Sequence, residues 1–236
     1  MYKVAALARF PQGVSKEDGS RYWTETHGAL GKRVPLLSRY VQSHVLGPLP
    51  SASGVSEEET FFDGYACCWF ADRATIEEAI ASPEWLELVA DGPNAFDMDW
   101  LAGMSGAVEE RTIKDGPAAP YKVVWVAKFK PGLAKEEASA YWTETHGQLA
   151  IKAPGISRYV QNHVVEPIGG GGWSDPDEVG FDGFSECWFE DEATFLHTVG
   201  TREWAAVVED GENVFDMTQM WGAVLEDRLI KATSPG

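Results

Sequence analysis

Apolar and polar residues alternate along short segments of this chain, and longer segments with helical spacing lie between them. Residues 2–10 are rich in apolar side chains and close at Pro11-Gln12-Gly13, which predicts a strand followed by a turn. Residues 37–46 and 65–70 also alternate as strands, and a last strand is expected over about 102–113. A loop rich in Ser, Gly and Glu separates the middle two strands. Its later counterpart carries the glycine run 169–172 and is expected to be a flexible linker.

Two helices are predicted between these strands. Ser15, followed by Asp18 three residues on, resembles a capping box, and the helix is expected to run to His27 and to end at glycine. A second helix is expected over 75–90, broken where Ser82 and Pro83 offer a new N-cap and a first-turn proline, and ended by Gly92.

The whole pattern occurs twice. YWTETHG from Tyr22 recurs from Tyr141, RYVQSHV from Arg39 recurs as RYVQNHV from Arg158, and the same spacing relates NAFDM to NVFDM. Such self-similarity indicates a tandem duplication. We expect repeats at 1–114 and 121–236, joined by the Pro- and Gly-containing linker 115–120.

The order strand, helix, strand, strand, helix, strand predicts an α+β fold. An antiparallel sheet with both helices on one face leaves its other apolar face bare, and the second copy can cover it. The expected architecture is therefore two ferredoxin-like (βαββαβ) repeats packed sheet to sheet, with a cavity at or between them.

Composition narrows the classes of partner. A net charge of −18 argues against binding to nucleic acid or to anionic membranes, and 44% hydrophobic residues indicate a compact globule. Without a membrane-length apolar run or a signal-peptide pattern, we expect a cytoplasmic protein. The three cysteines, with no CxxC pair, are interpreted as strand core residues.

Histidines are the first candidates for chemistry. His44 shares one face of the second predicted strand with Ser38, Tyr40 and Gln42, and the second copy repeats this row as Ser157, Tyr159, Gln161 and His163. We expect the row to line a pocket on the sheet face that the other copy encloses; the alternative is that it faces water.

A second histidine pair, His27 and His146, is expected at the end of the first helix. There the helix dipole and the nearby Glu25 or Glu144 would favour the imidazolium, although a role as a helix cap is equally compatible with the pattern. For the flanking aromatic pairs, Tyr22-Trp23 and Tyr141-Trp142, core packing is favoured over a catalytic role. Asp97 and Asp216 are expected as turn or strand-entry residues.

The third strand differs between the copies, because Glu186 occupies the position of Cys67. Glu186 either makes the two pockets chemically different or is a solvated edge residue, and the second reading is favoured. Trp69 and Trp188 on the same strands are counted with the aromatic residues expected to line the rest of the cavity. No metal site is expected, since no closely spaced His and carboxylate set occurs, and no phosphate or dinucleotide motif indicates a cofactor.

Together, YWTETHG, P-x-x-x-RYVQ-x-HV, FDG and FDM resemble the EthD family of dimeric α/β-barrel proteins, here fused in tandem. The resemblance implies a ferredoxin-like fold, a sheet-to-sheet pair and a cavity for a small molecule. It points to His27, Tyr40 and His44, and to their counterparts His146, Tyr159 and His163, as pocket residues.

The favoured hypothesis is a cofactor-independent lyase or isomerase acting on a small hydrophobic, aromatic or cyclic oxygenated compound. His44 or His163 would be the acid or base, Tyr40 or Tyr159 would stabilise an oxyanion, and His27 or His146 would assist. The remaining candidate substrate contacts are Tyr22, Tyr141, Trp23, Trp142, Gln42, Gln161, Trp69, Trp188 and Glu186. A binding or accessory protein for an oxygenase pathway, and a haem or metal-dependent oxidoreductase, are the alternatives; the fused chain could also form a homo-oligomer.

Overall fold

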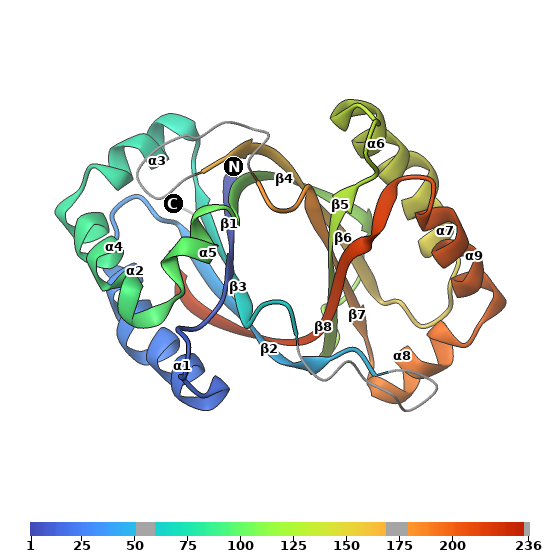
Figure 1. Ribbon diagram of the computed structural model, residues 1–236, viewed down its shortest axis with the longest axis horizontal. Helices are drawn as coiled ribbons and strands as arrows, with labels where there is room; N and C mark the ends of the chain where they lie inside the picture. Colours follow the sequence, from blue (N-terminus) through green and yellow to red (C-terminus); the bar gives the residue numbers. More distant parts are fainter. Residues whose placement is uncertain (51–59, 169–178, 234–236) are drawn as a thin grey trace.

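The computed structural model describes residues 1–50, 60–168 and 179–233, and shows a barrel of strands flanked by two groups of helices (Figure 1). The glycine run 169–172, expected as a linker, lies outside these residues. In the first repeat the elements are β1 (Tyr2–Ala8), α1 (Lys16–Tyr22), η1 (Trp23–His27), α2 (Gly28–Arg33), β2 (Arg39–Pro48), β3 (Gly64–Phe70), α3 (Arg73–Ile80), α4 (Pro83–Ala95), α5 (Met98–Ala102) and β4 (Ser105–Lys114).

The second repeat follows the same order without a counterpart of α5. Its elements are β5 (Tyr121–Phe129), α6 (Lys135–Tyr141), η2 (Trp142–His146), α7 (Gly147–Ala150), β6 (Arg158–Pro167), β7 (Gly183–Phe189), α8 (Glu192–Val199), α9 (Arg202–Gly211) and β8 (Phe215–Ala232).

Local signals in the sequence place most of the helix boundaries. Ser15 caps α1 by accepting a hydrogen bond from the Asp18 amide, and Ser82 caps α4 ahead of Pro83, so both predicted caps are confirmed. Two predicted ends are wrong. The first helix does not stop at His27 but continues through a π-turn into α2, and Gly92 lies inside α4, which ends at Ala95.

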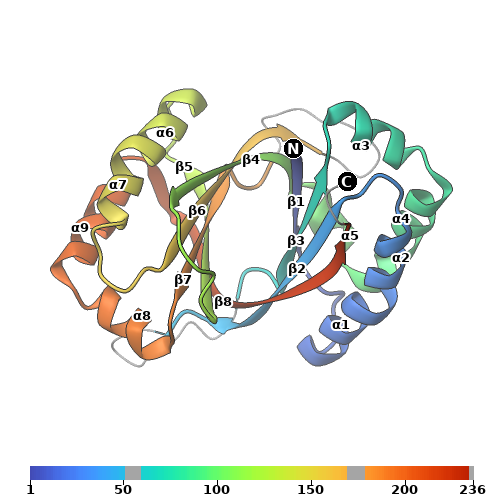
Figure 2. The ribbon, with the colours of Figure 1, turned by 180° about the vertical axis from the view of Figure 1, so that it is seen from behind.

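The strands close into a barrel because the last strand of each repeat crosses to the other repeat. β8 pairs with β5 over its first half and with β2 over its second half, and β4 likewise pairs with β1 and β6. The strand order around the barrel is β1-β3-β2-β8-β5-β7-β6-β4. From both sides, the helices cover only the outside of this barrel (Figure 2). The predicted α+β fold, two ferredoxin-like repeats joined as an intramolecular α/β barrel, is confirmed.

Alternation along the strands divides the side chains between the barrel interior and the helix-covered faces. The interior holds one apolar cluster that draws on both repeats, including Leu7, Val45, Val124 and Leu225. Lys3 and Lys122, at equivalent positions of β1 and β5, also point inward and are buried. A barrel interior that buries two ammonium groups requires carboxylates beside them.

Glu186 supplies the central carboxylate of this interior. Its Oε1 lies 2.5 Å from Lys122 Nζ and accepts a hydrogen bond of 2.6 Å from the Tyr65 hydroxyl of the other repeat. Lys122 also pairs with Asp227 at 2.8 Å, and Lys3 pairs with Glu110 at 2.7 Å. With 6% of its surface exposed, Glu186 is not the solvated edge residue that the sequence favoured, because β7 turns this position into the barrel.

We predict that Glu186→Gln destabilises the chain in a pH-dependent way. Burial alone would raise the pKa of Glu186, but Lys122 and Lys3 outweigh burial and lower it to about 2 from an ordinary value of 4.5. A carboxyl pKa depressed in the folded state stabilises the fold above the ordinary value, and this stabilisation is lost as the pH falls towards 2. Urea unfolding at neutral pH is expected to show a loss of about 3 kcal/mol in the variant.

The difference between wild type and Glu186→Gln is expected to shrink as the pH is lowered from 4.5 towards 2. Glu87→Gln is the matched control, because Glu87 pairs with Arg33 in an exposed position where an ion pair contributes little. A difference that stays constant between pH 7 and pH 3 would contradict the assignment.

Candidate functional site

Each repeat contains a cavity of about 400 Å³ between its helices and the outer face of the sheet. This position differs from the expected one, which was the sheet face enclosed by the other copy; that face is the filled barrel interior. The other repeat nevertheless contributes to each cavity wall, since Ile168 borders the first cavity, and Leu49 and Pro50 border the second. Both walls are mostly apolar, with a histidine and a tyrosine among them.

A π-turn presents the histidine to the cavity. Residues Trp23–His27 form η1, in which the Gly28 amide bonds the Trp23 carbonyl five residues back. Gln42 Nε2 donates to the same carbonyl at 2.9 Å, and a Cβ on Gly28 would lie 3.1 Å from that nitrogen, so glycine leaves room for the amide. π-turns inside α-helices occur frequently at functional sites. The second repeat forms the same turn, Trp142–His146.

The π-turn is also fixed from the other repeat. Arg228 of β8 donates to the hydroxyls of Ser20 and Thr24, at 3.0 and 2.8 Å. In the second repeat, Arg111 of β4 reaches Ser139 and Thr143 in the same way. The helix that carries each histidine is therefore held by a strand that begins in the opposite repeat.

His27 is oriented by a carboxylate on the neighbouring helix. Its Nδ1 lies 2.9 Å from Asp91 Oδ2, and the Tyr22 hydroxyl donates to Asp91 Oδ1 at 2.6 Å. Burial raises the pKa of Asp91, but hydrogen bonds from Tyr22, His27 and Asn94 lower it overall. Since an ionised carboxylate only accepts, Nδ1 carries the proton, and Nε2 presents a lone pair.

The charge state of His27 follows from its surroundings. Burial lowers its pKa below the ordinary value, and the opposing influence of Asp91 does not reverse that shift. The imidazole is therefore neutral near pH 7 and can accept a proton. His146 repeats the arrangement, with Asp210 at 2.9 Å and burial again lowering the pKa of the histidine.

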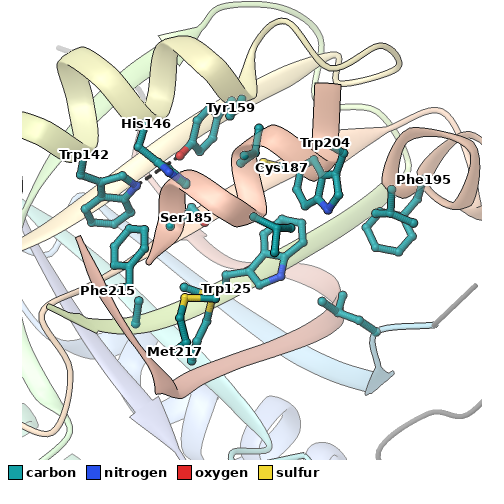
Figure 3. Close-up of a pocket in the computed structure, with 18 of the residues that line it drawn as sticks. Trp125, Trp142, His146, Tyr159, Ser185, Cys187, Phe195, Trp204, Phe215 and Met217 are labelled. Atoms are coloured by element: carbon teal, nitrogen blue, oxygen red, sulfur yellow. Dashed lines mark hydrogen bonds between the residues drawn. The ribbon is translucent and has the colours of Figure 1, made fainter. Parts of the chain in front are cut away.

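Tyr40 supplies a hydrogen-bond donor to the same cavity. Its hydroxyl oxygen accepts from Gln42 Nε2 at 2.9 Å and from Trp23 Nε1 at 3.2 Å, and among the described residues none accepts its proton. Burial raises the pKa of Tyr40, so the hydroxyl stays protonated. Tyr159 is held in the same way by Gln161 and Trp142. Figure 3 shows the polar ends of His146 and Tyr159 turned to the same part of the second cavity.

His44 and His163 do not reach the lining of either cavity. His44 lies behind Trp23, with ring centroids 4.4 Å apart, and its nitrogens contact Ser20 Oγ at 2.9 Å and Gln42 Oε1 at 3.1 Å. Burial, with Arg228 nearby, lowers its pKa to about 3; the pKa of His163 is lowered likewise, with Arg111 as the neighbour. The strand row that contains His44 faces its own helices, and only Tyr40 of the row borders open space.

The other expected site residues divide between the two faces of the sheets. Trp23 and Trp142 line the cavities, whereas Tyr22 and Tyr141 bond the carboxylates behind the histidines. Trp69, Trp188 and Glu186 point into the barrel, away from both cavities. Asp97 caps α5, and Asp216 accepts from the Thr218 amide, as turn residues do.

Asp91 and Asp210 are the site residues that sequence reasoning missed. A signal was present, because Asp-Gly stands three residues before NAFDM in one copy and before NVFDM in the other. Glu25 and Glu144, proposed as neighbours of the histidines, do not hydrogen-bond them, and Glu25 is exposed. The expected help from a helix C-terminus is also absent, since the helix continues past His27.

Sequence comparison identifies the family of this chain. A model of the EthD domain matches residues 11–99 and again residues 130–218. The chain belongs to the EthD family. The resemblance inferred from the THG and RYVQ-x-H motifs is therefore confirmed, as a tandem form. No curated protein sequence matches this EthD protein.

Solved structures support the fold. An anthrone oxidase-like protein is 12% identical, with 99% of this chain and 96% of that chain covered and a TM-score of 0.58. A proposed monooxygenase from Fusobacterium nucleatum is 10% identical, with 98% and 92% covered and a TM-score of 0.54. An EthD family protein from Bacillus halodurans is 20% identical, covering 45% of this chain and 93% of that chain, with a TM-score of 0.34. At these identities the first two show a shared barrel architecture.

Two further findings concern the described part of the EthD chain. None of its helices is long and apolar enough to cross a membrane. No group of three or more His, Cys, Asp or Glu side chains in that part is placed to hold a metal ion.

We predict that Asp91→Asn lowers the pKa of His27 further. The carboxylate stabilises the imidazolium, and its removal leaves the desolvation of the buried ring unopposed. An NMR titration of the assigned His27 signals measures this change. Glu25→Gln is the control and is expected to leave the titration where it was; an equal effect of both variants would refute the assigned pairing.

Proposed function

We propose that the protein is a cofactor-independent acid–base catalyst, of lyase or isomerase type, acting on small hydrophobic carbonyl compounds. One observation carries the proposal: a neutral histidine held by a carboxylate and a tyrosine with a free proton border the same apolar cavity. A neutral histidine on the wall of a cavity that also holds a donor for a developing negative charge suits proton abstraction beside a carbonyl.

The step assigned to the first repeat begins with a carbonyl compound whose oxygen accepts the Tyr40 O–H. His27 Nε2 removes a proton from the adjacent carbon, the C–H bond breaks, and its electron pair forms the enolate. Tyr40 stabilises the oxyanion, and Asp91 stabilises the imidazolium through Nδ1–H. Return of the proton to a different carbon isomerises the compound. Alternatively, the enolate re-forms its carbonyl, the bond to a β-hydroxyl breaks, and the imidazolium gives its proton to the departing oxygen, so that water leaves.

The walls support the assigned substrate class. Apart from His27 and Tyr40, the first cavity is bordered mainly by aliphatic and aromatic side chains, among them Leu37, Trp85 and Phe96. A volume of about 400 Å³ lies within the usual range for sites that enclose small organic ligands. Such walls favour apolar compounds with few polar groups.

We predict that the protein accelerates hydrogen–deuterium exchange at the carbon between the ring and the carbonyl of 2-tetralone, a bicyclic ketone. The His27→Gln/His146→Gln variant is expected to lose about 10²- to 10⁴-fold of this rate, because both bases are removed. Proton NMR in D₂O follows the exchange. His197→Gln, which changes an exposed histidine on α8, is the matched control.

The outcomes separate the proposed catalyst from the other functions. Tyr40→Phe/Tyr159→Phe is expected to lower the rate about tenfold or more while retaining the fold. Tight binding of 2-tetralone without any exchange above buffer would favour a binding or accessory protein. Activity that survives loss of His27 and His146 but disappears in His44→Asn/His163→Asn would show that His44 or His163 is the base.

We also predict that the exchange rate rises with pH through an apparent pKa below 6.5 and is flat at neutral pH. Burial lowers the pKa of His27 and of His146, so the neutral, base-competent form is lost only when the pH falls below the ordinary histidine range. Initial rates between pH 4.5 and 8 test this. A rate that instead increases through pH 7 or above would be incompatible with either histidine as the base.

A further inference from the structure

The two cavities share their histidine and tyrosine but differ at the centre of the sheet that forms their floor. In the first repeat, Ala6 of β1 stands opposite Ala66 of β3. In the second repeat, Trp125 of β5 stands opposite Ser185 of β7. All four residues line their cavities. Because the paired positions are direct cross-strand neighbours, each pair forms one continuous patch of the floor.

Trp125 builds an aromatic end into the second cavity. Its ring lies 5.3 Å from that of Trp204 and 6.3 Å from that of Phe195, measured between centroids. Figure 3 shows these rings gathered away from His146 and Trp142. On the other side of Trp125, Gly222 leaves space, since a Cβ there would lie 2.2 Å from Leu49 Cδ1 and 3.3 Å from Trp125.

Ser185 places a free hydroxyl on the same floor. Its side chain is buried, with 8% of the residue exposed, and among the described residues none hydrogen-bonds it. The serine of the first cavity, Ser105, is different because its hydroxyl donates to the Leu101 carbonyl at 3.3 Å. The hydroxyl of a buried residue on the wall of a cavity, without a partner among the described residues, is placed to bond a ligand.

The first cavity has an aliphatic floor instead. Ala6 and Ala66 leave open the place that Trp125 fills, and Val4, Leu101 and Ala102 border the same space. The counterpart of Phe195 is Ile76, which does not reach the lining. Each cavity measures about 400 Å³, and the two differ in the side chains that form their walls.

We infer that the two cavities take different ligands: the second takes a flat aromatic compound with a hydroxyl or carbonyl group for Ser185, and the first takes an aliphatic or alkyl-bearing carbonyl compound. Trp125 and Ser185 are the specificity-determining residues. The inference rests on the proposed function only in taking both cavities as ligand sites. One chain then applies the same proton-transfer groups to two classes of molecule.

Titration calorimetry with 2-naphthol and with 2-nonanone tests this. Wild type is expected to bind one equivalent of each compound tightly. Trp125→Ala is expected to lower the affinity for 2-naphthol about tenfold through loss of stacking and to leave the affinity for 2-nonanone unchanged. Trp125→Phe should retain most of the affinity. Ser185→Ala is expected to lower the affinity for 2-naphthol about fivefold. The affinity for naphthalene should not change, because naphthalene has no group that can hydrogen-bond the serine hydroxyl.

Ala6→Trp tests the first cavity in the same way. The added ring should fill part of that cavity and lower the affinity for 2-nonanone at least tenfold. Trp221→Phe, on the opposite face of the sheet, is the control and should change the affinity for neither ligand.

Binding of two equal equivalents of 2-naphthol to wild type, or unchanged 2-naphthol affinity in both Trp125→Ala and Ser185→Ala, would overturn the inference. Repeating the titrations in His27→Gln/His146→Gln separates this result from a failure of the catalytic proposal, because selectivity of binding does not need the bases.

Discussion

The exchange of the last strands between the repeats is the constraint on which the rest of this structure depends. β8 leaves its own sheet and completes the sheet of the first repeat, where Ile230 enters the core under α2 and α4. β4 does the same for the second repeat, with Ile113 in the equivalent core. A ferredoxin-like repeat alone would leave one sheet face and one edge uncovered. Here the crossing strands remove both problems at once.

The same exchange links each site to the opposite repeat. Arg228 lies on the crossing half of β8 and bonds Ser20 and Thr24, next to the turn that ends in His27. Ile168 and Leu49 add walls to the cavities of the repeats to which they do not belong. The geometry of either histidine is therefore a property of the whole barrel, and a separated repeat would lack both the arginine and part of the wall.

The repeat and the order of elements could be predicted from the sequence, because they depend on local spacing and on matched motifs. The family resemblance places His27 and Tyr40 at a pocket, and core packing is favoured for Trp23, which borders the first cavity. Sequence reasoning misjudged which face of the sheet is hollow. Alternation shows that Tyr40, Gln42 and His44 share a face, but packing between distant elements decides whether that face meets helices or the other repeat. The π-turn has no signal in hydrophobic spacing, so the sequence places His27 at the end of a helix, whereas the helix continues past it. Asp91 could not be identified from the sequence, because its role depends on a contact between two helices that the pattern of apolar and polar residues does not show.

Differences between the two repeats have different effects on the two faces of the sheet. On the inner face, Glu186 stands where the first repeat has Cys67. Its carboxylate pairs with Lys122 and accepts a hydrogen bond from Tyr65 of the other repeat, so this difference links the two repeats. On the outer face, exchanging Ala6 for Trp125 and Ala66 for Ser185 alters only the cavity floor. Since neighbouring residues on a strand point to opposite faces, the floor can diverge without disturbing the ions behind it. A fused pair can thus keep one barrel and the same histidine, tyrosine and aspartate residues while its two cavities become different.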